Sequence, residues 1–275
     1  MITKSAVAIA ESRIGKPLEK YFAGRVNSPL ERSWLAFKSS TWIIVLSGFL
    51  EPVLFLFSFG FGVGSLIGGI SNNGQTISYA AYIAPGLLAT SAMNGAVYDS
   101  TWNVFWKINE SKLYQSMLST SLGALDVALG EIAWALFRGL IYALGFMVVV
   151  TPLGLVTSWW GLLAIPAAVL IAFGFASFGM ALTSYMKSYQ QMNMINIFML
   201  PMFLFSGSFF PITVYPQFIQ WLIQALPLWH AISLVRGIML GQIGIATLLH
   251  ILYFFAMIAL GLLFTTKRLT ALFLR

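Results

Sequence analysis

The ionisable residue that stands out first is Glu51, which precedes Pro52 inside a long apolar run. A carboxyl group in hydrocarbon is costly, so it is expected to have a polar partner or a functional role. Pro52 deprives the carbonyl of Gly48 of its helical donor and can kink the helix. Arg138, Lys38 and the polar segment after residue 102 are candidate partners. Three roles therefore stay open for Glu51: an ion pair or interfacial anchor, part of a gating hinge, or a direct substrate contact.

Other residues with chemical potential are few and scattered. Glu131 and Arg138 are seven positions apart, too far for a neighbouring pair on one helix, so each is expected to contact another helix. His230 and His250 are too few and too far apart in the sequence to predict a metal site. No cysteine is present, and no Ser/His/Asp arrangement stands out, so the sequence predicts no catalytic site of its own.

A phosphate-binding loop is also missing from the sequence. Gly15-Lys16 is followed by Pro17 and lacks the upstream glycine of the G-x-x-x-x-G-K-[ST] pattern. The chain is therefore not expected to hydrolyse ATP by that mechanism. If transport is driven by ATP, a separate subunit must supply the ATPase.

The composition indicates a protein whose solvent is lipid. Hydrophobic residues make up 59% of the 275 residues and charged residues 8%, against roughly a quarter charged in ordinary globular chains. The net charge of +7 does not predict nucleic-acid binding, because the Lys and Arg residues cluster outside the apolar runs. There they are typical of topological signals and of contacts with lipid headgroups.

Six stretches reach the roughly 20 apolar residues that a membrane-spanning helix needs. They are residues 42–69, 79–100, 127–150, 160–185, 194–210 and 245–265. Basic residues gather in the N-terminal arm, in alternate connections and in the tail, whereas segments 71–78 and 151–159 have none. The positive-inside rule then predicts a multi-pass protein of the cytoplasmic membrane with both termini in the cytoplasm. The predicted fold class is all-α, with six transmembrane helices.

Three segments are not predicted to span. Pro17 to Ser40 mixes charged and apolar residues as an amphipathic helix in the inner interface does. Residues 103–126 form a polar connection with short helical potential, and 211–244 are predicted to be re-entrant half-helices in the outer leaflet. The sequence thus divides into a cytoplasmic arm, residues 1–40, and a six-span domain, residues 41–275. The arm is not expected to be a cleavable signal peptide.

Four motifs in register resemble a known family. They are Leu50 to Gly64 (LEPVLFLFSFGFGVG), Tyr82 to Ala89 (YIAPGLLA), Pro201 to Pro211 (PMFLFSGSFFP), and Pro227 to Ala231 (PLWHA) with Arg236-Gly237. In this order they resemble ABC type-2 exporter permeases, and within them the nodulation-type lipooligosaccharide exporter and daunorubicin-resistance permeases. The resemblance runs from Trp34 to the tail and is specific for the family but not for the substrate.

The resemblance implies a permease that binds no cofactor itself. It would pair with a second permease, identical or paralogous, and with two cytoplasmic ATPase subunits that hold ATP and Mg. The connection around Asn109 to Ser121 would contain the coupling helix that docks on the ATPase. The residues expected there are Asn109, Glu110, Ser111, Lys112, Leu113, Tyr114 and Gln115.

The same resemblance implies a central path between spans one and five, capped by the half-helices. Its expected path or gate residues are Glu51, Pro52, Phe59, Phe205, Ser206, Phe209, Phe210, Trp229 and His230. Two departures are Ser121, where many relatives have proline, and Trp229, where many have a small residue. Phe and Met side chains suit an amphipathic cargo, namely a glycolipid, a lipid-linked oligosaccharide or a lipophilic drug.

The alternative from another class is an ion-coupled secondary transporter. A transporter of that class is expected to contain several membrane-embedded carboxylates and often shows repeat symmetry. Here only Glu51, Asp99, Asp126 and Glu131 lie near the candidate spans, and no internal repeat is found. A membrane-bound enzyme is a third interpretation, disfavoured because a catalytic cluster is missing.

Overall fold

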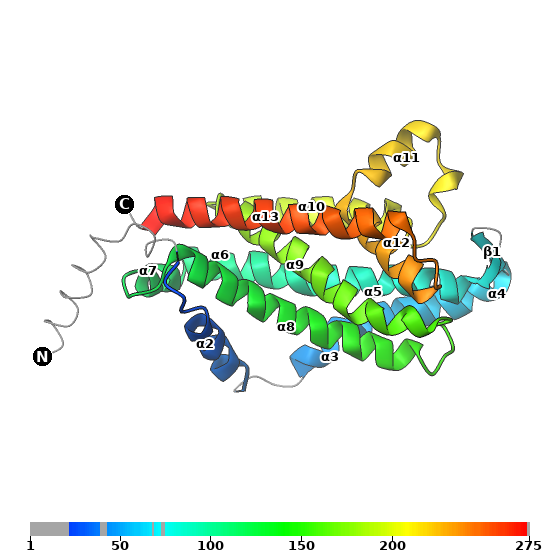
Figure 1. Ribbon diagram of the computed structural model, residues 1–275, viewed down its shortest axis with the longest axis horizontal. Helices are drawn as coiled ribbons and strands as arrows, with labels where there is room; N and C mark the ends of the chain where they lie inside the picture. Colours follow the sequence, from blue (N-terminus) through cyan, green and yellow to red (C-terminus); the bar gives the residue numbers. More distant parts are fainter. Residues whose placement is uncertain (1–21, 39–42, 68, 73–74, 274–275) are drawn as a thin grey trace, which may run out of the picture.

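A computed structural model describes residues 22–38, 43–67, 69–72 and 75–273. These residues form an elongated bundle of long helices with short helices and one small hairpin at its ends (Figure 1). The predicted all-α, polytopic membrane fold is confirmed. The connection containing α7 (Leu113–Leu118), the start of α8 (Ala124–Val150) and the end of α13 (Ile245–Phe273) lie at one end of the bundle, and the hairpin and α11 (Gln217–Gln224) lie at the other (Figure 1).

The elements follow one another in this order: α2 (Asn27–Lys38), α3 (Ile43–Phe55), the π-helix η2 (Leu56–Val63), α4 (Gly64–Ile67), β1 (Gly69–Asn72), β2 (Gln75–Ser78), α5 (Tyr79–Tyr98), the π-helix η3 (Asp99–Asn103), α6 (Val104–Asn109), α7 (Leu113–Leu118), α8 (Ala124–Val150), the 3₁₀-helix η4 (Trp159–Leu163), α9 (Ala164–Thr183), α10 (Tyr189–Phe205), the 3₁₀-helix η5 (Ile212–Val214), α11 (Gln217–Gln224), α12 (Pro227–Met239) and α13 (Ile245–Phe273).

Helices occupy all six predicted spans, but not all of them are apolar enough to be identified as spans by composition. Among the described residues, 50–67, 124–150, 159–183 and 245–273 are long and apolar enough to cross a membrane. A fifth crossing results only if α11 and α12, bent by 84°, are taken as one span. Helices α5 and α10 contain more small and polar residues. The count of six spans therefore stays a prediction.

The first span continues through Pro52 instead of breaking there. Helix α3 runs three residues past Pro52 and then widens into the π-helix η2. The carbonyl of Gly48, which Pro52 leaves without a helical donor, accepts a hydrogen bond of 3.5 Å from the Ser91 hydroxyl of α5. A neighbouring helix thus satisfies the freed backbone group, as is required inside a membrane.

The described part of the N-terminal arm is helical from Asn27 onward. Helix α2 covers Asn27–Lys38, whereas residues 17–21 and 39–40 of the predicted amphipathic helix lie outside the described residues. Trp34 packs edge-on against Phe137 of α8 at 5.5 Å between ring centroids. The proposed boundary between residues 40 and 41 also falls outside the described ranges, so the division into arm and span domain remains a prediction.

Two predicted segments differ from the structure. Segment 71–78, which was predicted only to lack Lys and Arg between two spans, contains the end of β1 and all of β2, and Ile70 pairs with Ile77 in antiparallel register. The fifth span ends at Phe205 and not at Phe210, and the chain is irregular until η5 begins at Ile212. Gly207 lies in this irregular segment with φ of +78°, a conformation that L side chains rarely adopt and that ends the helix.

Helix α13 lies against α9 at a glycine, which allows a stability prediction. A Cβ atom on Gly261 would lie 2.6 Å from the carbonyl carbon of Ser177 and 2.8 Å from the nitrogen of Phe178. Gly261→Ala is therefore expected to separate the two helices and destabilise the protein by about 1–3 kcal/mol. Thermal unfolding in detergent measures the effect. Gly62→Ala is the matched control, because a Cβ there meets nothing closer than 3.9 Å. Equal melting temperatures for the two variants would contradict the prediction.

Candidate functional site

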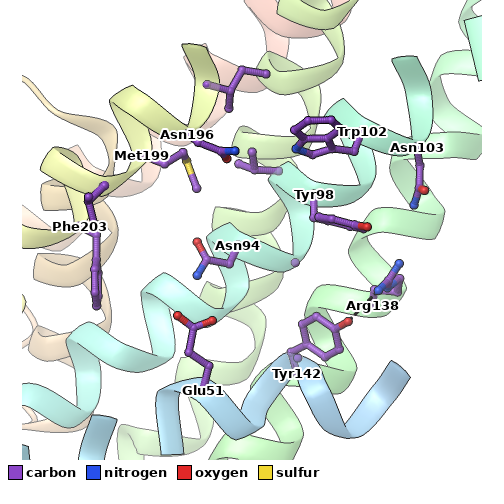
Figure 2. A pocket seen from close by; sticks show the side chains of 15 residues that line it. Glu51, Asn94, Tyr98, Trp102, Asn103, Arg138, Tyr142, Asn196, Met199 and Phe203 are labelled. Atoms are coloured by element: carbon purple, nitrogen blue, oxygen red, sulfur yellow. Dashed lines mark hydrogen bonds between the residues drawn. The ribbon is translucent and has the colours of Figure 1, made fainter. Parts of the chain in front are cut away.

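A cavity of about 800 Å³ lies between α3, α5, η3, α8 and α10 (Figure 2). Its volume is within the range of ligand-binding pockets. It is hereafter the polar cavity, and it is lined by Gly48, Glu51, Asn94, Gly95, Val97, Tyr98, Trp102, Asn103, Arg138, Tyr142, Ile195, Asn196, Met199, Leu200 and Phe203. Amides, aromatic rings and two charged groups thus gather within a bundle whose other surfaces are mainly apolar.

A carboxylate and two amides reach this cavity from three of these helices. Figure 2 shows the Glu51 carboxylate of α3 directed toward the Asn94 amide of α5, with Asn196 of α10 on the far side. Asn94 and Asn196 each offer two donors and one acceptor oxygen, whereas ionised Glu51 only accepts. The arrangement is suited to a ligand that carries several hydroxyl or amide groups.

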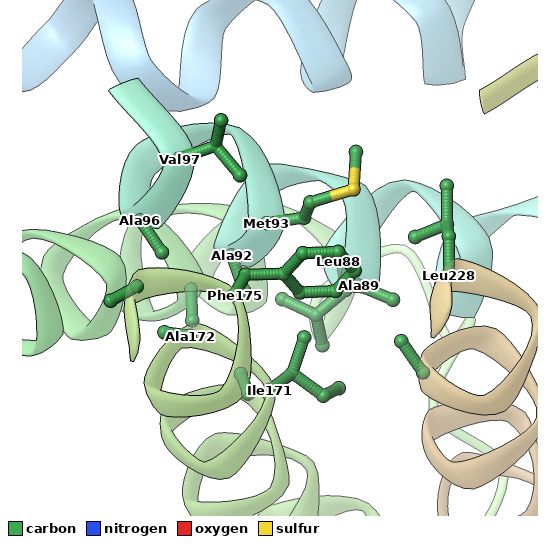
Figure 3. Packing of buried hydrophobic residues seen from close by; sticks show 14 of the residues in the cluster. Leu88, Ala89, Ala92, Met93, Ala96, Val97, Ile171, Ala172, Phe175 and Leu228 are labelled. Atoms are coloured by element: carbon green, nitrogen blue, oxygen red, sulfur yellow. The ribbon is translucent and has the colours of Figure 1, made fainter. Parts of the chain in front are cut away.

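Helix α5 forms a firm wall of the polar cavity because its other face is packed. Ala92 and Ala96 are fully buried, and they lie beside Ala172 and Phe175 of α9 (Figure 3). The small side chains of α5 let α9 approach closely, which fixes the position of the helix that carries Asn94. The cavity thus lies on one side of a close-packed interface.

A buried ion pair closes one side of the polar cavity. Arg138 of α8 donates a hydrogen bond of 2.6 Å to Asp99 of η3 and one of 2.8 Å to the hydroxyl of Tyr142. The side-chain amide of Asn103 also donates to the Asp99 carboxylate. The expectation that Arg138 contacts another helix is confirmed. Its candidacy as the partner of Glu51 is wrong, because the carboxylate it pairs with is Asp99.

Glu51 itself has no ionic partner in the described part of the chain. Its side chain is exposed, and neither Arg138 nor Lys38 forms an ion pair with it. It also lines a second hollow of about 400 Å³, hereafter the apolar hollow, with Leu50, Leu54, Phe55, Ser58 and Phe59. Glu51 therefore stands at the junction of a polar cavity and an apolar hollow.

A second ion pair links the predicted coupling connection to the bundle. Lys107 of α6 lies 2.5 Å from the carboxylate of Glu131 in α8. Glu131 thus contacts another helix, as expected from its spacing to Arg138. Together with Asp99–Arg138, this pair attaches both α6 and the π-helix η3 to α8.

The predicted coupling residues lie together on the turn between α6 and α7. The exposed ones are Asn109, Glu110, Ser111, Lys112 and Gln115, whereas Leu113 is half-buried. Tyr114 is fully buried, and burial raises the pKa of its hydroxyl well above the usual value. Lys112 is the one non-glycine residue with positive φ (49°) in the described ranges, so it marks a sharp turn. Tyr114 therefore anchors the turn. Its exposed neighbours can contact a partner, although Glu110 also has a hydrogen bond with the hydroxyl of Tyr189 in α10.

Ser121, one of the two departures from the family pattern, has a structural contact in this chain. The guanidinium of Arg25 donates a hydrogen bond to the Ser121 hydroxyl. The N-terminal segment is thereby attached to the end of the coupling connection. Proline at this position could not accept that bond, since it has no side-chain oxygen.

The predicted path phenylalanines fall into two groups. The ring centroids of Phe59 and Phe209 lie 5.3 Å apart. Phe59 also contacts Phe55, and Phe209 contacts both Phe55 and Phe203, so the four rings form one aromatic cluster beside the polar cavity. Phe205 and Phe210 are about half exposed, and the structure brings neither into this cluster. Ser206 is buried and donates to the carbonyl of Met202 at the end of α10, which is a helix-terminating contact.

Trp229 and His230 lie away from the polar cavity and pack against α13. The Nδ1 atoms of His230 and His250 are 2.8 Å apart, although the residues are twenty positions apart in sequence. Their separation in the sequence therefore does not keep the two rings apart in the fold. Within the described residues, however, no group of three His, Cys, Asp or Glu side chains that could hold a metal is found.

Sequence reasoning missed the cavity residues Asn94, Tyr98, Trp102 and Asn196. The two asparagines had a usable signal, since an amide inside an apolar span needs a partner just as Glu51 does. Trp102 carries no such signal, because most tryptophans of membrane proteins lie in the aromatic belt at the interface.

The fold and the site define a multi-pass membrane permease. Residues 26–240 match the ABC-2 type transporter family, so the chain belongs to that family. The family implies association with an ATPase subunit. The chain is similar to Nodulation protein J of Sinorhizobium fredii (strain NBRC 101917 / NGR234), with 35% identity over 80% of this chain and 83% of that protein. It is also similar to Nodulation protein J of Rhizobium leguminosarum bv. viciae, with 34% identity over 80% and 84%.

Proposed function

We propose that this chain is the permease of an ATP-driven exporter that moves an amphipathic molecule across the cytoplasmic membrane. The observation that carries the proposal is the adjacency of the polar cavity and the apolar hollow, which share Glu51. A sugar-containing headgroup fits the amides and aromatic rings of the first, and an acyl chain fits the second. Among the three cargo classes, this lining favours a glycolipid or lipid-linked oligosaccharide over a lipophilic drug.

The path is proposed to run between two permease copies. Leu54 and Phe57 of the first span and Phe198 of α10 are largely exposed in the single chain. These residues would face lipid or a second permease, whose first and fifth spans would complete the path. An identical copy and a paralogue both fit this arrangement.

The inner face is proposed to be the end that contains α7. Described basic residues of that end include Lys112 after α6, Lys187 before α10 and Arg268 near the end of α13. The β1–β2 hairpin and α11 at the other end contain no Lys or Arg in their described residues. This charge asymmetry supports cytoplasmic termini and a cytoplasmic coupling turn.

Two ATPase subunits are proposed to push on the α6–α7 turns of the two permeases. Motion of this turn would reach the polar cavity through Lys107–Glu131 and Asp99–Arg138, which link α6 and η3 to α8. The carboxylates of Glu131 and Asp99 thus both take part in structural ion pairs. That disfavours the ion-coupled alternative, which needs carboxylates that bind and release ions during transport.

Charge reversal on the coupling turn tests the proposal. Glu110→Lys combined with Lys112→Glu leaves the buried Tyr114 in place, so the fold is expected to persist. The permease–ATPase complex, reconstituted in proteoliposomes, is expected to lose roughly tenfold in ATP-dependent glycolipid transport, because contacts between charged groups at the ATPase surface become repulsive.

The matched control for this test changes two exposed residues at the other end of the bundle. Thr213→Glu combined with Gln217→Lys adds the same charges there and is expected to leave transport unchanged. Normal coupling in the Glu110/Lys112 variant would remove the proposed role of the turn. Transport by the purified permease without any ATPase would overturn the whole proposal.

A further inference from the structure

The charges around the polar cavity do not cancel. Both terminal nitrogens of Arg138 are engaged, one by Asp99 and the other by Tyr142. Its positive charge is therefore balanced by a carboxylate behind the cavity wall. Glu51 has no ion-pairing partner among the described residues, so the cavity has one uncompensated negative charge.

The other polar groups of the cavity are neutral. The amides of Asn94 and Asn196 both donate and accept hydrogen bonds, whereas a carboxylate has acceptors only. The rings of Tyr98 and Trp102 add flat apolar faces with one polar atom each. Arg138 is the cation among the lining residues, and its charge is already compensated by Asp99.

We propose that Glu51 makes the permease selective by headgroup charge. The cavity accepts headgroups that are uncharged or cationic and rich in O–H and N–H donors, and it disfavours phosphorylated ones. A phosphate offers acceptors to an acceptor-only carboxylate and adds charge repulsion, whereas a hydroxyl or ammonium donates to it. This inference rests on the proposed function and narrows its cargo to one class of glycolipid.

Three probes with the same hexadecyl chain test the charge preference. They are the N-acetylglucosaminide (neutral), the glucosaminide (cationic) and the N-acetylglucosaminide 6-phosphate (anionic). The permease–ATPase complex is placed in phosphatidylcholine nanodiscs, which have no net headgroup charge of their own. Binding is followed by quenching of tryptophan fluorescence, and coupling by the stimulation of ATP hydrolysis at pH 7.

The wild-type complex is expected to bind the phosphate probe roughly tenfold more weakly than the neutral probe. Glu51→Gln is expected to reduce this difference in affinity, hereafter the gap, to less than about threefold, mainly because it strengthens binding of the phosphate probe. Glu51→Asp is expected to retain the gap, since it keeps the carboxylate. Asn94→Asp adds a second negative charge to the same wall and is expected to widen the gap. Glu31→Gln, which removes an exposed carboxylate of α2 outside the cavity, is the matched control and is expected to leave the gap unchanged.

The outcomes separate the two claims. Equal binding of the neutral and phosphate probes by the wild type, or an unchanged gap in Glu51→Gln and Asn94→Asp, overturns charge selection while glycolipid export stands. If no probe binds the wild type or stimulates its ATP hydrolysis, both the inference and the glycolipid export on which it rests fail. A gap that follows the charge at positions 51 and 94 supports the proposal.

Discussion

Arg138→Met is expected to destabilise the protein by about 3–5 kcal/mol, because it leaves the buried Asp99 carboxylate without its cation. Among the described residues, one oxygen of Asp99 has no hydrogen-bond partner, and the other would keep only the neutral amide of Asn103. The hydroxyl of Tyr142 loses a donor as well. Thermal unfolding of the purified protein in detergent and the yield of folded protein measure the effect.

The double variant Arg138→Met with Asp99→Asn is the decisive comparison. Removal of the orphaned charge is expected to restore more than half of the lost stability, since a neutral amide is far cheaper to bury than a lone carboxylate. Transport is expected to stay impaired in the double variant, because η3 is then no longer attached to α8 by an ion pair. A double variant as unstable as Arg138→Met alone would show that packing and not charge accounts for the loss.

Asp126→Ala is expected to release the N-terminal segment from the bundle. The Asp126 carboxylate, fully buried at the start of α8, accepts backbone hydrogen bonds from Ala23 (2.7 Å), Arg25 (3.1 Å) and Gly123 (2.9 Å). Alanine leaves these three N–H groups without their acceptor. A loss of about 2–3 kcal/mol is expected, since hydrogen bonds to a charged group are the stronger kind.

Limited trypsin digestion reports the release directly. Cleavage after Arg25 and Arg32 is expected to accelerate at least fivefold in Asp126→Ala, whereas cleavage at Lys267 and Arg268 at the other terminus stays unchanged. Asp126→Asn keeps an acceptor oxygen and is expected to give an intermediate rate. Uniform acceleration at all sites would indicate global unfolding, and no acceleration would remove Asp126 as the anchor.

The contacts of Asp99 and Asp126 could not be predicted from the distribution of charged residues along the sequence. Asp99 and Asp126 were noticed in the sequence only as acidic residues near the ends of spans. In the structure one holds an arginine 39 positions further along the chain, and the other holds backbone groups about a hundred positions earlier. Neither contact follows from spacing, because both join segments that only the bundle brings together.

The contacts of the aromatic residues were also predicted only in part from the sequence. Phe59 and Phe209 were expected on one path and do meet, although Phe209 lies in the irregular segment after α10. Phe205, Phe210, Trp229 and His230 were expected on that path too, yet none of them lines the polar cavity. The early end of α10 at Phe205 changes the direction of the residues that follow, and no hydropathy pattern specifies that direction.

The sequence by itself determined that the protein lies in a lipid bilayer, where its long helices are approximately, which family it belongs to, and that it lacks a phosphate-binding loop. Those properties depend on composition and on short windows of residues, so no knowledge of the fold is needed. The tertiary structure decided which side chains meet, Asp99 with Arg138 and Lys107 with Glu131, and that Glu51 lines one cavity with two asparagines. Such meetings depend on the rotation and depth of each helix against its neighbours, and these are set by packing over the whole bundle.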